Sequence, residues 1–338
     1  MSRNLKLGIL DQSIVREGFS ASDAIRETIE TAKLAEELGY TRFWISEHHN
    51  AASIAGSTPE VLMVKLADET KQIRIGSGGI MLPNHSALKV AENFRMLETL
   101  FPGRIDLGMG RAPGGDRITA SLLNPSNTFS EESYLLQLSH LQHYFNDTAE
   151  TKYGQLLAVP QADTIPQQWI LSSSGGSSRI AADFGMGLVI ARFINGQAGP
   201  DIIDTYREHF KPSVQFPEPH AMLSISVLCA ETEEKANEMR KLMDFRLLQF
   251  EKGNFDKPGS YESINDYTFS PTELARIAFN SGRVVSGTPS SVKHQLTELA
   301  DLFDIDEIIV ATMTGTVEDR RRSFELLAEV FELKKQIV

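Results

Sequence analysis

The chain has 338 residues, 41% of them hydrophobic and 23% charged, and a formal net charge of −12. This composition is ordinary for a globular protein, and an acidic chain without a Lys/Arg-rich block argues against nucleic acid as the main partner. Its one cysteine, Cys229, excludes an intrachain disulfide. The first residues run directly into a strand-like segment and no apolar run reaches about 18 residues, so we expect no signal peptide, no membrane span and a cytoplasmic protein.

Strand and helix signals alternate about eight times along the chain. After a strand at 5–10, apolar residues recur every three or four positions, the period of a helix with one buried face. Ser22 with Asp23 predicts the beginning of this helix and Gly39 its end. Further strands are predicted at 42–47, 73–82, 102–111, 167–174, 185–192, 221–230 and 307–313. Further helices are predicted at 59–70, 88–100 and 131–145, from 177, at 232–250 and 290–302, and from 317 onward.

Several of these strands are apolar nearly throughout, which is typical of a parallel sheet covered by helices. Eight strand–helix units predict an α/β protein with a (β/α)₈ TIM barrel, built as one domain over 1–338. An open doubly wound sheet is the alternative. Two less regular stretches, 111–127 and about 253–286, are expected as insertion loops over the carboxyl ends of the strands, where barrel active sites lie. The composition and position of 253–286 predict a lid.

Charged and imidazole side chains abruptly end the second predicted strand. Glu47, His48 and His49 follow its apolar residues, at the mouth of the expected barrel. Adjacent residues of an extended strand point to opposite faces, so His48 and His49 are poorly placed to share a metal ion. We expect an acid, base or hydrogen-bonding role for His48, with a structural histidine bonded to a carboxylate as the alternative. His140 and His143 lie three apart on a predicted helix, where solvated histidines are commoner than metal ligands, and we predict no metal site.

Two glycines, Gly78 and Gly79, end the third predicted strand. Glycines at this place let a flat ligand approach the backbone or let the chain adopt an unusual geometry. A simple bulge or turn explains the pair equally well.

An arginine framed by glycines, Arg111, follows the fourth predicted strand in the segment DLGMGRAPGG. A guanidinium at this place is suited to bind a phosphate or a carboxylate. The alternative is an exposed loop arginine.

The most specific local pattern is SSSGGSSRIAADFGMG at 172–187. A strand ends in serines and glycines that open a helix, so hydroxyls, backbone N–H groups and a helix N-terminus converge there. That combination predicts a phosphate site, although it is neither a P-loop nor GxGxxG. A plain Ser/Gly-rich loop with an N-cap is the alternative.

Taken together and in this order, three segments resemble the bacterial-luciferase-like flavin monooxygenase superfamily. They are SEHHN at 46–50, the long segment from IGSGGIMLPNH to RAPGGD at 75–116, and SSSGGSSRIAADFG at 172–185. The resemblance spans nearly the whole chain. It implies a (β/α)₈ barrel, usually dimeric, that uses reduced FMN and dioxygen.

The resemblance also implies roles for individual residues. His48 matches the active-site histidine beside the flavin ring, with Glu47 and His49 as its neighbours. Gly78 and Gly79 match a pair joined by a non-prolyl cis peptide beneath that ring. Arg111 matches a phosphate-binding arginine. The phosphate loop of the family matches Ser173, Ser174, Gly175, Gly176 and Ser177.

This sequence departs from the luciferases at two places: Gly110 stands where they have a reactive cysteine, and Ser173 where they have a glutamate. The resemblance therefore gives no support for light emission. It implies a cytoplasmic, homodimeric monooxygenase that receives reduced FMN from a separate flavin reductase and oxygenates a small organic substrate with O₂. A deazaflavin-dependent oxidoreductase on the same barrel, a non-catalytic flavin-binding protein and a metal hydrolase are the alternatives. The superfamily uses aldehydes, sulfonates, amines and heterocycles, so the substrate stays open.

Overall fold

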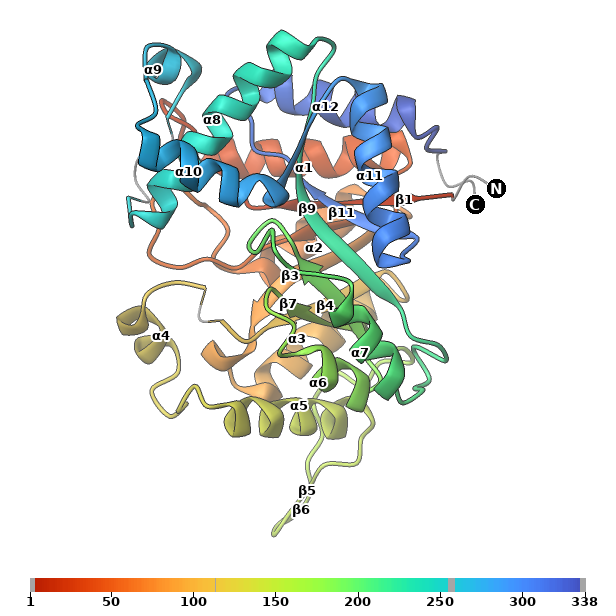
Figure 1. Cartoon of the computed structure of the whole chain (residues 1–338). Helices are drawn as coiled ribbons and strands as arrows, with labels where there is room; N and C mark the ends of the chain where they lie inside the picture. The colour runs from red at the N-terminus through yellow and green to blue at the C-terminus, as the bar shows by residue number, and fades with distance from the viewer. Residues whose placement is uncertain (1–3, 113, 255–258, 335–338) are drawn as a thin grey trace.

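The computed structural model describes residues 4–112, 114–254 and 259–334, and its centre is a closed barrel of parallel strands (Figure 1). The strands pair in the order β1, β2, β3, β4, β7, β8, β9, β11, and β11 pairs again with β1. The predicted (β/α)₈ barrel is therefore confirmed, and the open doubly wound sheet is wrong. The barrel strands are β1 (Lys6–Asp11), β2 (Arg42–Ile45), β3 (Arg74–Met81), β4 (Ile105–Gly110), β7 (Gln167–Ser172), β8 (Gly187–Ala191), β9 (Ala221–Cys229) and β11 (Glu307–Ala311).

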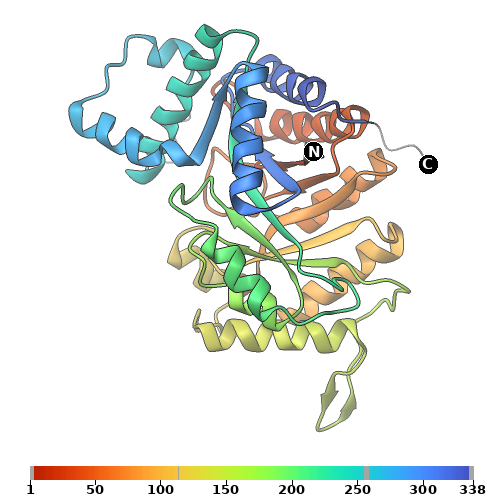
Figure 2. The same ribbon diagram turned by 45° about the vertical axis from the view of Figure 1, so that its right-hand side comes forward.

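Helices cover the outside of this barrel in both ribbon views (Figures 1 and 2). None of the helices within the described ranges is long and apolar enough to cross a membrane. The larger helices are α1 (Ala21–Leu38), α2 (Pro59–Glu69), α3 (Ala87–Leu100), α5 (Glu131–Phe145), α7 (Asp201–His209), α8 (Glu233–Glu251), α11 (Pro289–Phe303) and α12 (Val317–Val330). The short helix α6 (Ser178–Asp183) follows β7.

The first helix shows how local sequence sets the ends of an element. The Ser20 hydroxyl accepts a hydrogen bond from the Asp23 N–H, and the Asp23 carboxylate accepts one from the Ser20 N–H. This reciprocal cap makes Ser20 the N-cap, so the predicted beginning at Ser22 with Asp23 lies too late along the chain. Gly39 ends the helix as predicted, with a left-handed φ of 90°.

The stretch 253–286, predicted as irregular, is largely ordered in its described part. A capping box between Ser270 and Glu273 begins its longer helix, and its last residues pair with the carboxyl half of β9, with Val284 opposite Ser226. Residues 255–258 lie outside the described residues, and the lid function stays a prediction. The elements are α9 (Tyr261–Asn265), α10 (Pro271–Asn280), η2 (Ser281–Arg283) and β10 (Val284–Gly287).

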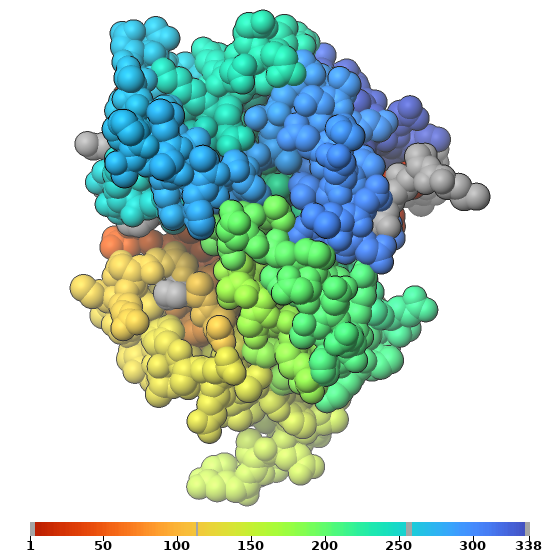
Figure 3. Space-filling view, viewed as in Figure 1, coloured from red at the N-terminus to blue at the C-terminus, as the bar shows by residue number. Residues whose placement is uncertain are grey.

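The second insertion, 111–127, carries a short helix that the sequence did not predict. Asp116 is its N-cap, because its carboxylate accepts hydrogen bonds from the N–H groups of Ile118 and Thr119 at 2.9 and 3.0 Å. In the space-filling view, orange atoms of the loop after β2 appear between this yellow segment and the blue segment of α10 (Figure 3). The remaining short elements are α4 (Arg117–Leu123), η1 (Leu82–Asn84) and the hairpin β5 (Glu150–Thr151) with β6 (Gly154–Gln155).

Large side chains that point into the barrel fill its amino-terminal half. Trp44 of β2 and Trp169 of β7 are almost fully buried and pack edge to face, with ring centroids 5.8 Å apart. The Arg42 guanidinium lies 5.0 Å from the Trp169 ring centroid and donates to Asp106 at 2.6 Å and to Glu307 at 2.8 Å. These buried charges are tolerated because they pair with one another at short range.

Glycines on the neighbouring strands make room for these rings. A Cβ on Gly76 would lie 2.5 Å from the Trp44 ring, and one on Gly187 would lie 2.2 Å from the Trp169 ring. A Cβ on Gly108 would lie 2.2 Å from the backbone oxygen of Ser77. The amino-terminal half of the barrel is thus closely packed with protein, and a ligand has to lie above it, at the carboxyl ends of the strands.

Gly108→Ala is expected to destabilise the fold by about 1–3 kcal/mol or more, because the added methyl overlaps a strand backbone that cannot rotate away. Urea unfolding followed by circular dichroism measures this change. Gly176→Ala serves as the control, since the nearest atom to its Cβ lies 3.9 Å away, and we expect a change within about 0.5 kcal/mol. Equal stabilities of wild type and Gly108→Ala would contradict the packing argument.

Candidate active site

The predicted site residues lie at the carboxyl ends of four strands that are neighbours in the barrel, β2, β3, β4 and β7. Glu47, His48 and His49 follow β2, and the glycine pair lies within β3. Arg111 follows β4 directly, and the segment 173–177 connects β7 to α6. The fold therefore brings all of the predicted residues to one side of the barrel mouth.

The carboxylate of Glu47 is completely buried and accepts hydrogen bonds from several directions. His49 Nε2 lies 2.8 Å from Oε1, and His85 Nε2 lies 2.9 and 3.0 Å from the two oxygens. The Met81 N–H donates to Oε2 at 2.9 Å. The Asn84 amide donates to Oε1 at 3.3 Å. Glu47 therefore joins the loop after β2 to the turn after β3.

These contacts lower the pKa of Glu47 and raise the pKa of His85. Burial alone would raise the pKa of Glu47, but the hydrogen bonds from His49 and His85, the charge of His85 and the Met81 N–H lower it to about 2. Burial alone would lower the pKa of His85, but the hydrogen bond and charge of Glu47, with the charge of Glu60, raise it above its ordinary value of 6.5.

His48 has a different environment from its two neighbours. Its Nδ1 lies 3.1 Å from the Ser46 hydroxyl, and its backbone N–H donates to the Gly56 carbonyl at 2.9 Å. Burial lowers the pKa of His48, against the raising effect of the Glu47 charge. The imidazole is therefore neutral near pH 7. Within the described ranges Nε2 has no hydrogen-bond partner, so it can accept a proton from a ligand.

The loop that carries His48 is tied to the loop after β1. The Val15 N–H donates to the Ser53 carbonyl at 2.8 Å, and the Ala55 N–H donates to the Ser13 carbonyl at 2.9 Å. These bonds form a short antiparallel bridge across the barrel mouth. The backbone of His48 is thus fixed within a loop that is itself tied to the loop after β1, so it is pre-organised before any ligand binds.

Gly78 and Gly79 are joined by a non-prolyl cis peptide, as the resemblance implied. The strand register also shifts between Gly78 and Ile80, so the bulge and the unusual geometry coexist. A Cβ on Gly79 would lie 2.5 Å from Leu171 Cδ1 and 2.6 Å from the Gly108 oxygen. No side chain fits there, which leaves bare backbone at this point of the barrel interior.

Arg111 and the Ser/Gly loop come together as predicted for an anion site. Arg111 Nη2 lies 3.9 Å, and Ser174 Oγ 4.0 Å, from the position a Cβ of Gly176 would take. Across the parts of the chain that the structure describes, no partner is found for the hydroxyls of Ser173, Ser174 and Ser177 or for the N–H groups of Gly176 and Ser177. Arg111 itself pairs with Glu131 at 2.6 Å, an ion pair largely open to solvent. These donors are available to a phosphate.

A tyrosine that the sequence did not single out extends this group. Tyr134 of α5 is 1% exposed, and its hydroxyl has no hydrogen-bond partner among the described residues. Burial raises the pKa of Tyr134, while the nearby charge of Arg111 acts to lower it. A buried hydroxyl without a partner costs free energy, so its presence beside Arg111 fits a site that a ligand completes.

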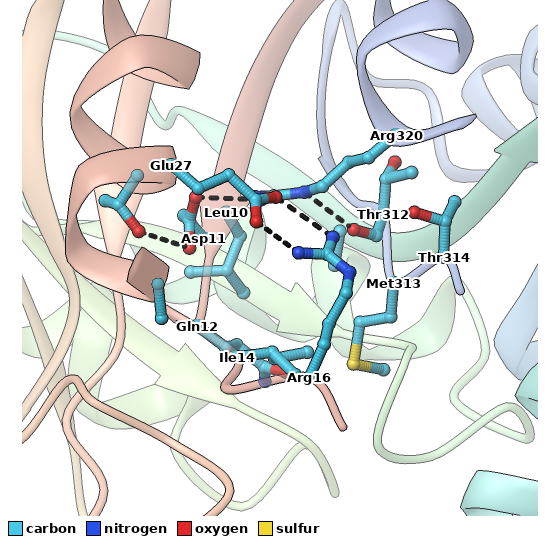
Figure 4. Close-up of a pocket in the computed structure, with 13 residues that line it drawn as sticks. Leu10, Asp11, Gln12, Ile14, Arg16, Glu27, Thr312, Met313, Thr314 and Arg320 are labelled. Atoms are coloured by element: carbon cyan, nitrogen blue, oxygen red, sulfur yellow. Dashed lines mark hydrogen bonds and ion pairs between the residues drawn. The ribbon is translucent and has the colours of Figure 1, made fainter. Parts of the chain in front are cut away.

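A second charged cluster lies at the carboxyl ends of β1 and β11 (Figure 4). Arg320 donates to Asp11 at 2.8 Å and to Glu27 at 3.0 Å, and Arg16 donates to Glu27 at 2.9 Å. The two guanidinium and two carboxylate groups balance one another. The cavity they enclose measures about 10 Å³, room for about one water molecule, so the cluster ties the first and last strands together rather than binding a substrate.

The predicted helix histidines His140 and His143 are remote from these groups in the sequence, and His143 Nδ1 lies 3.0 Å from the Thr148 hydroxyl. In the described ranges no three His, Cys, Asp or Glu side chains are arranged to hold a metal ion. The candidate active site consists of the Glu47 cluster, His48, the glycine pair, Arg111 and the Ser/Gly loop at 173–177.

Comparison with known proteins shows the family. The luciferase-like monooxygenase family model matches residues 5–304. The chain belongs to the luciferase-like monooxygenase family. It is 47% identical to the uncharacterized protein YwcH of Bacillus subtilis over 97% of this chain and 99% of that protein. It is 36% identical to the N-acetyl-S-alkylcysteine monooxygenase of Bacillus subtilis, over 96% of this chain and 98% of that enzyme.

Solved structures of similar proteins have the same fold as this chain. The crystal structure of apo-MsnO8 has a TM-score of 0.91 and 35% identity over 98% of this chain and 99% of MsnO8. The oxygenating constituent of 3,6-diketocamphane monooxygenase from Pseudomonas putida, solved in complex with FMN, has a TM-score of 0.69 and 17% identity, covering 96% and 97% of the two chains. The latter likeness concerns the fold alone.

Sequence reasoning missed His85 and Tyr134 as site residues. His85 lay inside a segment that carried the family resemblance, in the run MLPNH, but nothing local shows that it faces Glu47. Tyr134 falls on the apolar face of a predicted helix, where a tyrosine reads as ordinary core. Only the tertiary structure brings either residue to the site.

Inorganic phosphate is expected to raise the melting temperature of the wild type, and Arg111→Gln to weaken this phosphate binding about tenfold by removing its charged donor. Glu131→Gln is expected to strengthen the binding about twofold to fivefold, because it releases the guanidinium from a solvent-exposed ion pair. Thermal-shift titrations with phosphate measure both changes. Glu132→Gln, one residue along the same exposed turn, is the control, and equal titrations of wild type and Arg111→Gln would exclude this phosphate site.

Proposed function

We propose that this chain is an FMN-dependent monooxygenase that uses reduced FMN and O₂ to oxygenate a small organic substrate. The observation that carries the proposal is the convergence of a Ser/Gly loop with unpaired donors, a glycine pair without side chains and a neutral histidine at one side of the barrel mouth. Membership in the luciferase-like monooxygenase family supports the same reaction class.

The residues fit a cofactor that has a phosphate at one end and a flat ring system at the other. The phosphate would accept hydrogen bonds from Arg111, Ser174 and Ser177, with the Tyr134 hydroxyl beside them. The ring system would lie against the glycine pair of β3, where side chains are excluded. When bound, reduced FMN supplies the electrons that activate dioxygen.

His48 is the proposed proton-transfer residue. A neutral imidazole accepts a proton at neutral pH, and the Ser46 hydroxyl at 3.1 Å from Nδ1 orients its ring. Water exclusion comes from the loops that close the barrel mouth, including the bridge between Val15 and Ser53. The 253–286 insertion would complete this cover as a lid.

The electron donor and the substrate are further parts of the proposal. The sequence contains neither a GxGxxG nor a P-loop motif, which supports a separate flavin reductase as the source of reduced FMN. The relative named N-acetyl-S-alkylcysteine monooxygenase, 36% identical over nearly all of this chain, supports a small thioether bearing an amide and a carboxylate as the first substrate to test.

Stopped-flow mixing of reduced FMN and protein with aerated buffer tests this function. Wild type is expected to delay the return of the oxidised-flavin absorbance at least about tenfold relative to free reduced FMN, because the site excludes water from the reacting ring. His48→Ala is expected to lose most of the delay, since it removes the proton-transfer group. His294→Ala, an exposed histidine of α11, is the control.

Reoxidation as fast as that of free FMN would overturn the proposal. The next candidate would then be the deazaflavin cofactor F420, which the alcohol dehydrogenase with a TM-score of 0.68 and 14% identity to this chain carries. Tight FMN binding without any oxygenated product from thioethers, aldehydes, sulfonates or amines would favour a non-catalytic flavin-binding protein.

We also propose that the chain forms a homodimer through α2 and α3. These helices are in contact, and both expose apolar side chains: Val61 is 68% exposed and Leu100 is 51% exposed. Exposed apolar side chains on two helices in contact are a surface that a second copy of the chain could cover.

Val61→Asp combined with Leu100→Asp is expected to convert a dimer into a monomer, because each charge would be buried without a partner at the interface. Size-exclusion chromatography with light scattering measures the mass. Val214→Asp, at a fully exposed loop position, is the matched control. A wild-type monomer at micromolar concentration, or a double variant that stays dimeric, would refute this interface.

A further inference from the structure

The Glu47 cluster has a feature that the proposed reaction does not use: one buried carboxylate bonded to two histidines from different segments. We propose that Glu47 and His85 are positioning residues that clamp the end of β3 to the loop carrying His48, and that the clamp is stronger while His85 is protonated. The effect of the clamp on flavin binding rests on the proposed function; the clamp itself does not.

The mechanical argument starts from the position of the bonds. The Met81 N–H that donates to Glu47 lies two residues after Gly79, so Glu47 fixes the strand immediately beyond the glycine pair. His85 follows the η1 turn and bonds both carboxylate oxygens. On the opposite side of this turn, the amides of Gln137 and Asn124 donate to the His85 carbonyl at 2.7 and 3.2 Å. The turn is therefore held from two sides, and Glu47 provides the link to the loop of His48.

The electrostatic argument concerns the charge of the buried carboxylate. Within the described ranges no lysine or arginine pairs with Glu47, so its cationic partner is a histidine. The titratable groups around it are His48 and His49 on its own loop and His85 on the turn after β3, while Glu60 of α2 acts on His85 from outside. If His85 loses its proton, the carboxylate stays buried beside neutral groups, which is unfavourable.

The sign of the resulting pH dependence follows from linkage. The pKa of His85 is raised on folding, so its contribution to stability is fully present below about 6.5 and is lost as the pH rises through the raised value. The pKa of His48 is lowered, so His48 is neutral in the same interval. Between the two values His85 is charged and His48 is neutral, which is the state that the site requires.

Direct titration of His85 tests the clamp without any flavin. Nuclear magnetic resonance of the ¹⁵N-labelled imidazoles, with His85 assigned by its loss in His85→Gln, is expected to give a pKa above 6.5 in the wild type. In Glu47→Gln the value should fall to 6.5 or below, because the carboxylate charge is gone while burial remains. Glu298→Gln, which removes the partner of the exposed His294, should leave His85 unchanged. A wild-type His85 that titrates at or below 6.5, or one unaffected by Glu47→Gln, would overturn the proposal.

The affinity for flavin, measured as a function of pH, distinguishes the proposed role of the His85 charge from a purely structural role, which would give no such pH dependence. From about pH 7 to 10, above the second titration of the FMN phosphate near 6, the affinity of wild type for oxidised FMN should fall about tenfold as His85 deprotonates. His85→Gln should bind FMN weakly, and its affinity should not depend on pH in this range. This variant also tests the clamp if Glu47→Gln does not fold. His294→Gln is the control.

The possible outcomes separate the two proposals. Equal slopes in wild type and His85→Gln, with weaker binding at every pH, would show that His85 is only structural and would overturn the clamp. Absence of FMN binding at every pH would count against the proposed cofactor, and the resonance experiment would still decide whether Glu47 holds the proton on His85.

Discussion

The limited space inside the barrel determines which residues its strands can carry and where a ligand can lie. Trp44 and Trp169 occupy the amino-terminal half, so their neighbours at 76 and 187 have to be glycine, while the backbone oxygen of Ser77 requires glycine at 108. Beneath the rings, the buried Arg42 is held by Asp106 and Glu307. Because this half is filled, a ligand has room only at the carboxyl ends, where the candidate site residues follow the strands.

The same packing explains the glycine at position 79 of β3. A side chain at Gly79 would collide with Leu171 and with the backbone of β4, so the glycine is required by the barrel before any ligand is considered. The bare backbone that results is also what a planar ring needs above it. Both the packing of the barrel and the binding of a planar ring require glycine here. If a variant of this glycine failed to bind the ligand, the result would not show which of the two requirements had been broken. His48 and Arg111 are better probes, because no strand glycine of the barrel packs against either side chain as Gly79 packs against Leu171.

The sequence predicted the barrel well because a buried parallel strand and an amphipathic helix each have a distinct local pattern. It predicted which strands carry the candidate site for a related reason. The carboxyl ends of parallel strands meet at one edge of the barrel, so polar residues that follow these strands lie close together. It failed where the signal is not local. His85 meets Glu47 across 38 residues of chain, through a turn whose path cannot be read from composition. The helix α10 was missed because Gly, Pro, Asn and Ser around it suggested a loop, while its beginning depends on the Ser270–Glu273 cap.

The proposed anion site of this acidic protein depends on the charges close to it and not on the net charge of the chain. The net charge of −12 repels an anionic cofactor at long range, but screening limits that repulsion to about 8–10 Å at physiological salt. At short range the guanidinium of Arg111 and the donors of the Ser/Gly loop dominate. Glu131 holds Arg111 close to this loop in an exposed pair, and such a pair is weak. A phosphate with nearly two charges and several acceptor oxygens can displace Glu131, so the ion pair competes only weakly with a phosphate for Arg111.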